Sequence, residues 1–412
     1  MDARKPFSLT TKMARNVDST TSFDDLPLEA AEEIFTRLPV KTLIRSTSVC
    51  KTWYSNITNP TFTSAHIQHS LSCCDETAVL IIPSKYKNNK SCSLISARTG
   101  HVLKTYTIPF TTNAGMIKLV ASLNGILCLA ECPLDNFGRP AADEFQELYL
   151  WNPSVGKYKA LFSSCFKRRG KCSYAVGLGF LEGSCDFRVV RVAFCKDDVG
   201  CLLGKVAPKV EVYSLKTNKW RRIRNPVVPR VARDSGKTVG NSMTYWLDRD
   251  PEKLYSCSEE GYIVYFDFNR EVFGQIELPD DVRNCVGLMA TFKLMTFESK
   301  LAVFVFNDVQ ESNGLKLMPS CIWLLSHEDG KFSWTPRFKV VLGEHVFPFS
   351  LSRSGALIVL SACPPVPGLV SCNLKSQDLR LTKPLVTDPC SVDTAFVESL
   401  LMLEGRDEQK NS

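Results

Sequence analysis

A strand, a polar turn and a second strand recur as a unit through most of this chain. The six clearest occurrences lie at residues 96–102, 151–158, 213–220, 266–273, 326–334 and 372–379. Between residues 76 and 388, short runs of β-branched and aromatic residues are separated by Gly, Asn, Asp and Pro, with almost no helical periodicity. Their spacing, roughly 50 to 60 residues, is that of four-stranded propeller blades. The sequence therefore predicts a large all-β domain that forms a β-propeller of about six blades.

The blades are expected to be kelch-like, although the paired glycines of kelch repeats are missing from the six segments. A large β-sandwich, or a pair of smaller β domains, is the alternative that this strand pattern leaves open. Two hairpins are predicted within the β region. One covers residues 118–132 around Asn124-Gly125, a pair that suits a type I′ turn because both central residues need positive φ. The other covers residues 254–268 around a polar turn at 258–261.

The strand that follows this second turn carries large apolar residues on both faces. By the two-residue period of a strand, Val264 and Phe266 share one face, and Ile263 and Tyr265 share the other. Such a strand must be covered on both sides, as it is when blades stack face to face.

The segment at residues 23–57 has a helical period instead. Its first apolar residues recur at steps of three and four, so a helix gathers them on one stripe: Leu28, Ala31, Ile34, Phe35 and Leu38. Pro27 suits the first turn of this helix, and Pro39 ends it. A second apolar set, interrupted by the hydroxyl run at 46–48, predicts two more short helices: Val40, Leu43, Ile44, Val49, Trp53 and Ile57. Residues 60–69 are expected to add a further helix.

A helical unit of roughly forty residues cannot bury this much apolar surface internally, so part of the surface is expected to bind a partner. The elements that carry a resemblance are Leu26-Pro27, Arg37-Leu38-Pro39-Val40-Lys41 and Val49-Cys50-Lys51-x-Trp53. In this order they resemble the F-box, the motif with which substrate receptors of cullin-RING ubiquitin ligases bind a Skp-family linker protein. The resemblance implies that the linker-facing residues are Leu26, Pro27, Ile34, Leu38, Leu43, Val49 and Trp53.

A second resemblance covers the β region. The motifs at residues 122–128 (SLNGxLC), 150–153 (LWNP), 174–180 (YAVGLGF), 186–192 (DFRVVRV) and 212–220 are similar, in order, to the F-box-associated domain of plant F-box proteins. The resemblance implies a plant ubiquitin-ligase receptor. Asn152-Pro153 forms a rigid hairpin corner, and Gly177 with Gly179 permits a close backbone approach, so these motif residues are interpreted as structural.

The sequence divides into five expected parts. They are a disordered tail at 1–22, an F-box helical domain at 23–70, the F-box-associated propeller-like domain at 71–390, a closing segment at 391–403 and a second disordered tail at 404–412. In the closing segment, Val392, Phe396, Leu400 and Leu403 follow Ser391 at helical steps, which predicts a short helix or a closing strand.

Charge, apolar runs and cysteine usage indicate which partners and which compartment to expect. The net charge is +7, and the densest basic clusters lie at 167–171 and 220–224, where either could touch nucleic acid or an acidic protein. No aromatic-interleaved stripe or nucleic-acid motif accompanies them. We therefore expect solvated loops and strand ends rather than a nucleic-acid site. No apolar run is long enough for a membrane span. The 17 cysteines contain no Cys-x-x-Cys pair and predict free thiols in a reducing compartment, the cytoplasm and/or the nucleus.

Only one group of residues has the chemistry of a metal site. His66, His69, Cys73 and Cys74 are close in sequence, but no second spaced pair accompanies them, so neither a metal nor another cofactor is expected. A propeller hydrolase would need paired carboxylates or a metal cage in the central channel, whereas the acidic residues fall mostly in turns and only five histidines exist. We expect no catalytic residue.

The function that fits these features is that of a substrate-recognition subunit of an SCF-type (Skp-cullin-F-box) ubiquitin ligase. Its expected partners are the Skp-family linker, through it the cullin and RING subunits, and an unidentified protein target. The loops from Leu134 to Glu144 and from Phe166 to Lys171 are long, polar and rich in Gly, Pro or basic residues, and they are the candidates for target capture. An F-box interaction scaffold outside any ligase is the alternative.

Overall fold

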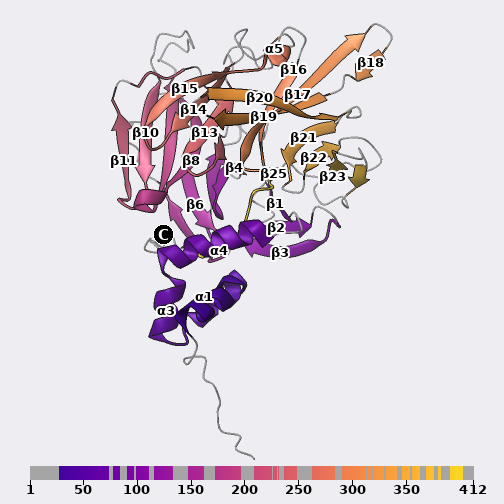
Figure 1. Cartoon of the computed structure of the whole chain (residues 1–412). Coiled ribbons are helices and arrows are strands. Elements are labelled where there is room, and N and C mark those ends of the chain that lie inside the picture. Colours follow the sequence, from indigo (N-terminus) through magenta and orange to yellow (C-terminus); the bar gives the residue numbers. More distant parts are fainter. Residues whose placement is uncertain are drawn as a thin grey trace, which may run out of the picture.

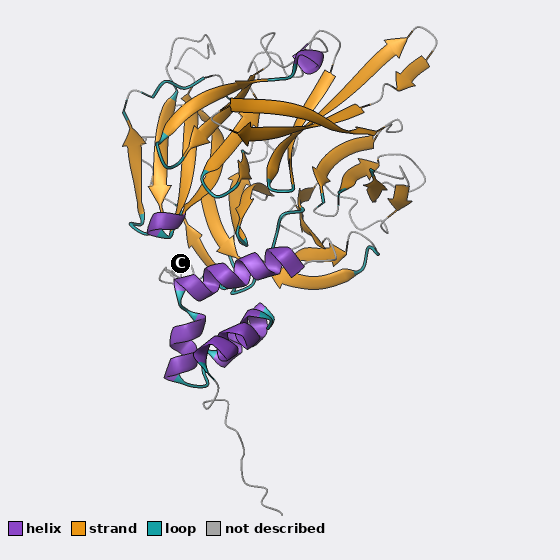
Figure 2. Ribbon diagram, viewed as in Figure 1, coloured by secondary structure: helices purple, strands orange, loops and turns teal. Residues whose placement is uncertain are grey.

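The computed structural model divides the chain into a helical N-terminal part and a ring of sheets (Figure 1). It describes residues 27–73, 78–83, 91–96, 99–110, 116–132, 147–161, 172–195, 208–224, 226–229, 231, 236–247, 262–283, 290–311, 314–317, 320–328, 331–340, 346–352, 355–361, 368–374, 379–381 and 390–401. Beyond the N-terminal helices, the helical structure among these residues is limited to short pieces such as η2 (Glu182–Ser184) and α5 (Asp280–Arg283) (Figure 2). No helix in the described part of the chain is long and apolar enough to cross a membrane.

Four helices form the N-terminal part: α1 (Leu28–Thr36), α2 (Val40–Ser46), α3 (Lys51–Ile57) and α4 (Pro60–Cys73). Pro27 and Pro39 are the residues that precede α1 and α2, where a proline costs no helical hydrogen bond. Cys50 caps α3, because its Sγ accepts a hydrogen bond from the Trp53 backbone N–H at 3.4 Å. The break that was predicted at the hydroxyl run falls between α2 and α3.

Six antiparallel sheets follow, and we number them as blades in chain order. Blade 1 contains β25 (Cys390–Asp393), β1 (Ala78–Pro83), β2 (Ser91–Ser96) and β3 (Val102–Thr107). Blade 2 contains β4 (Met116–Leu123), β5 (Ile126–Cys132), β6 (Leu148–Asn152) and β7 (Lys157–Ala160). Blade 3 contains β8 (Cys172–Leu181), β9 (Asp186–Cys195), β10 (Lys209–Ser214) and β11 (Lys219–Ile223).

The other three blades have the same order. Blade 4 contains β12 (Lys237–Val239), β13 (Met243–Leu247), β14 (Tyr262–Asp267) and β15 (Val272–Glu277). Blade 5 contains β16 (Ala290–Phe297), β17 (Lys300–Glu311), β19 (Ser320–Glu328) and β20 (Lys331–Val340), with β18 (Gly314–Leu317) paired to β17. Blade 6 contains β21 (Val346–Leu351), β22 (Ala356–Ser361), β23 (Gly368–Asn373) and β24 (Leu379–Leu381).

The predicted six-bladed propeller is therefore confirmed, and the β-sandwich alternative is wrong. Each of the six sequence repeats coincides with the turn between the third and fourth strands of one blade. The ring closes at its two ends, because β25 pairs antiparallel with β1, with Leu80 opposite Asp393. Of the two alternatives for the closing segment, residues 390–393 form the strand.

One predicted hairpin is confirmed and the other is wrong. Asn124 and Gly125 join β4 to β5 with φ values of 52° and 81°, the left-handed conformation that the type I′ turn requires. The second hairpin was expected to pair β14 with residues just before 258. Instead β14 pairs with β13 along one edge and with β15 along the other, so no edge is left for that partner.

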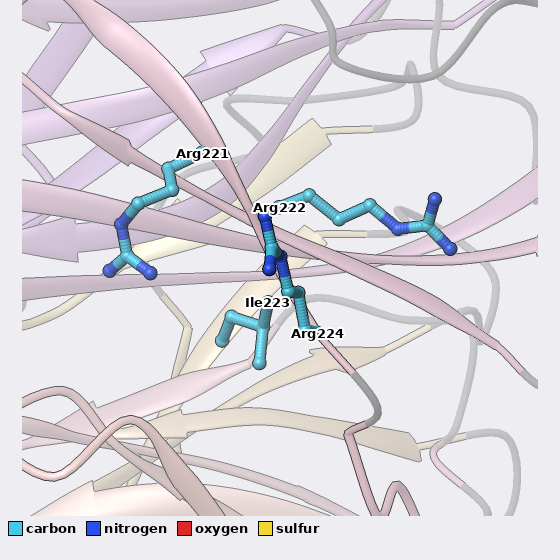
Figure 3. A pocket seen from close by; sticks show the side chains of 4 residues that line it. All are labelled: Arg221, Arg222, Ile223 and Arg224. Atoms are coloured by element: carbon cyan, nitrogen blue, oxygen red, sulfur yellow. The ribbon is translucent and has the colours of Figure 1, made fainter.

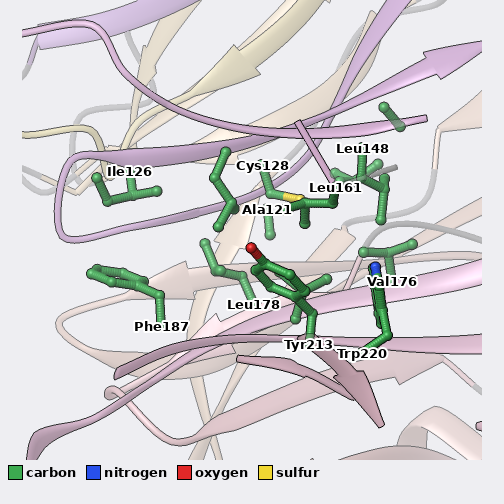
Figure 4. Packing of buried hydrophobic residues seen from close by; sticks show 14 of the residues in the cluster. Ala121, Ile126, Cys128, Leu148, Leu161, Val176, Leu178, Phe187, Tyr213 and Trp220 are labelled. Atoms are coloured by element: carbon green, nitrogen blue, oxygen red, sulfur yellow. The ribbon is translucent and has the colours of Figure 1, made fainter. Parts of the chain in front are cut away.

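The apolar core consists of separate layers between neighbouring blades. Figure 4 shows the layer between blades 2 and 3, where Cys128 and Leu148 face Leu178 and Tyr213. Val264 and Phe266 pack toward blade 3, whereas Ile263 and Tyr265 pack toward blade 5. The predicted two-sided burial of this strand is thus confirmed, and every blade is covered on both faces by its neighbours.

Two glycines of the inner strand of blade 3 allow the neighbouring blade to approach. A Cβ atom on Gly177 would lie 2.5 Å from Cγ2 of Thr244, and one on Gly179 would lie 2.3 Å from Cδ2 of Phe268. Phe268 is fully buried, so its ring has little room to move. The structural interpretation of this glycine pair is therefore confirmed.

We predict that Gly179→Ala lowers the free energy of unfolding by about 1–3 kcal/mol, because the added methyl group overpacks the contact between blades 3 and 4. Denaturant unfolding of the full chain measures the change. Gly183→Ala is the matched control, since no atom lies within 4 Å of the added Cβ there. Equal stability of the two variants would contradict this account of the blade contact.

Candidate protein-binding surfaces

The F-box helices share one small core. Phe35 of α1 packs edge-on against Trp53 of α3, with ring centroids 5.0 Å apart, and against Phe62 of α4 at 6.4 Å. Val40, Leu43 and Ile57 complete this buried cluster. His66 lies in the same interior, where its Nε2–H donates a hydrogen bond to the Leu38 carbonyl at 3.0 Å. These contacts hold α4 against the three shorter helices.

Apolar side chains on the outside of these helices remain uncovered. Ile34 is 42% exposed, Val49 is 63% exposed and Tyr54 is 58% exposed. The described part of the chain exposes seven large apolar residues, and these three, which lie within residues 27–73, are among them. Exposed apolar surface concentrated in so small a unit is typical of a protein-binding surface.

The predicted linker-facing residues differ in accessibility. Ile34, Val49 and Pro27 are exposed, and Leu38 and Trp53 are half-buried. Leu43 has 0% exposure inside the helical core. It therefore packs beneath the exposed side chains and cannot itself touch a partner. Leu26 lies outside the described residues.

Tyr54 was missed by the sequence analysis. It follows Trp53 in α3, and successive helical residues point about 100° apart, so burying one ring directs the next toward solvent.

The helical core also contains a residue from the far end of the chain. Leu400 is 3% exposed and belongs to the cluster formed by Phe35, Leu43 and Phe62. Figure 1 shows the described C-terminal end lying next to α4, between the helices and the sheets. Residues 396–401, which we call the C-terminal strap, thus connect the propeller to the F-box helices.

Asn152 fixes the strap to blade 2. Its fully buried Nδ2 donates hydrogen bonds to the carbonyl oxygens of Ser399 at 3.1 Å and Leu401 at 2.8 Å. The Ser399 N–H in turn donates to Oγ of Ser154 at 3.3 Å. Asn152 was predicted only to shape a hairpin corner, and it also does this, because its Oδ1 accepts from the Ser154 N–H at 2.9 Å.

Glu398 fixes the strap to blade 1. Its carboxylate pairs with the Lys104 ammonium and accepts a hydrogen bond from the Tyr106 hydroxyl at 2.8 Å. Burial, followed by the nearby Glu398 charge, raises the pKa of Tyr106 above its ordinary range, so the phenol remains a donor at neutral pH. The strap is therefore held by two blades as well as by the helices.

The soft ligands noted in the sequence do not gather into one site. His66 is buried and bonded to the backbone, whereas His69 Nε2 lies 3.2 Å from Cys73 Sγ one helical turn away. Cys74 lies outside the described residues. Across the part of the chain that the structure describes, no three His, Cys, Asp or Glu side chains are grouped as metal ligands.

The structure describes neither of the two loops that were predicted to capture a target. The loops from Leu134 to Glu144 and from Phe166 to Lys171 lie outside the described residues, as does the basic cluster at 167–171. The second basic cluster falls on the outer strand of blade 3. There Arg221, Arg222, Ile223 and Arg224 line a hollow of about 840 Å³ (Figure 3).

Comparison with known families agrees with this two-part geometry. The F-box domain family matches residues 23–64, which include α1, α2, α3 and the start of α4. The family described as the F-box associated beta propeller domain matches residues 140–360, more than half of the chain. The chain is a plant F-box protein. An F-box joined to a substrate-binding propeller is the combination typical of F-box proteins in SCF ligases.

Several curated F-box proteins of Arabidopsis thaliana are similar over most of their length. An F-box/kelch-repeat protein is 26% identical, with 75% of this chain and 77% of the relative covered. The F-box protein CPR1 is also 26% identical, with 80% of this chain and 76% of the relative covered. A third F-box protein is 27% identical over 92% of this chain and 89% of its own length.

We predict that Asn152→Ala lowers the free energy of unfolding of this F-box protein by about 1–3 kcal/mol, because two buried carbonyl groups of the strap lose their donor. Denaturant unfolding of the full chain measures the loss. Asn269→Ala, at an exposed turn residue, is the control and is expected to change little. A stability equal to that of the control would show that the strap does not depend on Asn152.

We also predict that thiol reactivity follows burial. Desolvation raises the pKa of Cys92 and of Cys128 to about 12, so at pH 8 very little of either is the reactive thiolate. Cys73 and Cys185 are exposed, so a reagent can reach both thiols in the folded protein. Alkylation of the native protein at pH 8, read by peptide mass spectrometry, should label the exposed pair and spare the buried pair, and denaturation should make all four reactive. Disulfides at these positions would refute the expectation of free thiols.

Proposed function

We propose that this F-box protein is the substrate-recognition subunit of an SCF-type ubiquitin ligase. In this proposal the F-box helices dock on a Skp-family linker, which connects them to the cullin and RING subunits, while the propeller holds a target protein. The observation that carries the proposal is the exposed apolar surface of Ile34, Val49 and Tyr54 on helices whose own core is already filled. Covering such side chains favours association.

The proposed contribution of this chain is geometric and non-catalytic. Holding a target lysine close to a charged conjugating enzyme raises the effective concentration of the two reactants, which accelerates transfer without any nucleophile or base from the receptor. A rigid connection between linker and target favours this role. The strap supports it, because Leu400 packs among the F-box helices while Glu398 and Ser399 are bonded to blades 1 and 2.

The proposal places the protein in the cytoplasm and/or the nucleus, where ubiquitin ligases of this type work. Free thiols are consistent with a reducing compartment. Each of the eight cysteines whose state the structure describes is free.

The docking surface can be tested with the double variant Ile34→Ala/Val49→Ala in the full chain. Each truncation removes an exposed apolar anchor without opening the helical core, so affinity for a purified Skp-family linker should fall at least about tenfold. Titration calorimetry measures the affinity. Val272→Ala is the matched control, since Val272 is 48% exposed but lies on blade 4.

Linker affinity unchanged in the double variant would overturn the docking surface. Co-purification of cullin with the wild-type chain then separates a ligase receptor from an F-box scaffold. Recovery of the linker without cullin would favour the scaffold.

A further inference from the structure

The outer strand of blade 3 concentrates exposed positive charge. Within the six residues 219–224, Lys219, Arg221, Arg222 and Arg224 are exposed, whereas Trp220 is buried. Figure 3 shows the side chains of Arg221 and Arg222 extending to opposite sides of the strand. A segment of this composition attracts anionic groups on both faces of the sheet.

One edge of this strand has no partner strand in the described structure. β11 is the last strand in the order β11-β10-β9-β8 and pairs only with β10, with Val212 opposite Arg221. An outermost strand presents backbone N–H and C=O groups along its open edge, and these groups can pair with an added extended peptide. The hollow of about 840 Å³ that is lined by residues 221–224 lies at this strand.

The arginines of this strand differ in how their charge is neutralised. Arg221 is paired with the carboxylate of Glu271, the closer contact being 2.5 Å. For Arg222 and Arg224, no carboxylate among the described residues lies within ion-pair distance. These two guanidinium groups therefore keep their donors available, and a guanidinium matches a carboxylate with two parallel hydrogen bonds.

Contacts with the rest of blade 3 hold the strand that carries these charges in place. The buried Trp220 ring lies 4.4 Å from the Arg191 guanidinium, which forms a buried ion pair with Glu211. The Tyr213 hydroxyl donates to Oδ1 of Asn218 at 2.7 Å, which fixes the turn before the strand. Lys219, Arg221 and Arg222 thus project from an ordered strand, and Arg224 follows directly after its last residue, which lowers the entropy lost on binding.

Charged residues on an edge strand also protect against aggregation, and lysine is the residue commonly used for that purpose. Three arginines in four residues, a hollow beside them and two guanidinium groups with no described carboxylate within ion-pair distance go beyond that need. We infer that the outer edge of blade 3 binds an extended acidic segment of the target protein. The segment adds to β11 as a fifth strand, and its carboxylates pair with Arg222 and Arg224.

This inference rests on the proposed role of the propeller in holding the target, but not on linker docking. The probe is a fluorescein-labelled octapeptide of four glutamates and four valines, titrated with the full chain and followed by fluorescence anisotropy. We expect Arg222→Glu/Arg224→Glu to raise the Kd at least about tenfold, because two attractive contacts become repulsive. The matching peptide with glutamine in place of glutamate should not bind detectably.

The charge control lies on another outer strand. Lys331→Glu/Arg337→Glu on β20 changes the net charge by the same amount, and it should alter the Kd less than twofold. Equal weakening by both double variants would reduce the effect to net charge and overturn the site. A peptide with N-methyl groups on alternate backbone nitrogens should lose binding, and full binding by that peptide would overturn strand addition.

Two further measurements identify the anionic group that binds and separate this site from linker docking. A phosphoserine peptide that binds through Arg222 and Arg224 while the glutamate peptide does not would overturn the assignment to carboxylates. Linker affinity of Arg222→Glu/Arg224→Glu is measured in parallel and should equal that of the wild type. Lost peptide binding with intact linker binding supports the site. Peptide binding by a wild-type chain that fails to bind the linker refutes the SCF proposal and leaves the acidic-segment site in place.

Discussion

The pairing of β25 with β1 joins residues that are more than 300 positions apart, and the rest of the propeller depends on it. The apolar layers lie between blades rather than within them, so each blade needs a neighbour on both sides. An open ring would leave the layer between blades 6 and 1 uncovered. One strand therefore determines whether the last layer forms.

The same C-terminal end also connects the two parts of the molecule. After β25, the strap runs past blades 1 and 2 and inserts Leu400 among the F-box helices. The ring closure and the attachment of the F-box are thus consecutive steps along one short stretch of chain. This arrangement limits rotation between the F-box helices and the propeller, which the proposed ligase role would require in order to place a target at a fixed distance from the transfer machinery.

Much of the fold could be predicted because its signals are local. The turn between the third and fourth strands is short in every blade, so all six repeats could be recognised in the sequence. The hairpin before β14 was mispredicted because the turn signal at 258–261 lies within a longer connection, and the true partner, β13, is further upstream. Pairing across a long connection leaves no local pattern.

The candidate site was predicted less completely, for two physical reasons. Short helices carry apolar residues around much of their circumference, so the sequence could not tell buried Leu43 from exposed Ile34, or show that Tyr54 faces solvent. The contribution of Leu400 to the helical core depends on the tertiary fold alone. The charge of residues 220–224 was visible in the sequence, but their position on an unpaired edge required the sheet order.

The position of Leu400 has a consequence for biosynthesis. The F-box helices leave the ribosome before the propeller strands, yet Leu400, a residue of their core, follows the closing strand β25 in the chain. Domains fold in order during synthesis, but here the first segment reaches its full set of contacts only after the final strand has closed the ring. A chain truncated before the strap carries an F-box whose interior is incomplete. The order of translation thus links the completion of the F-box core to the closure of the propeller.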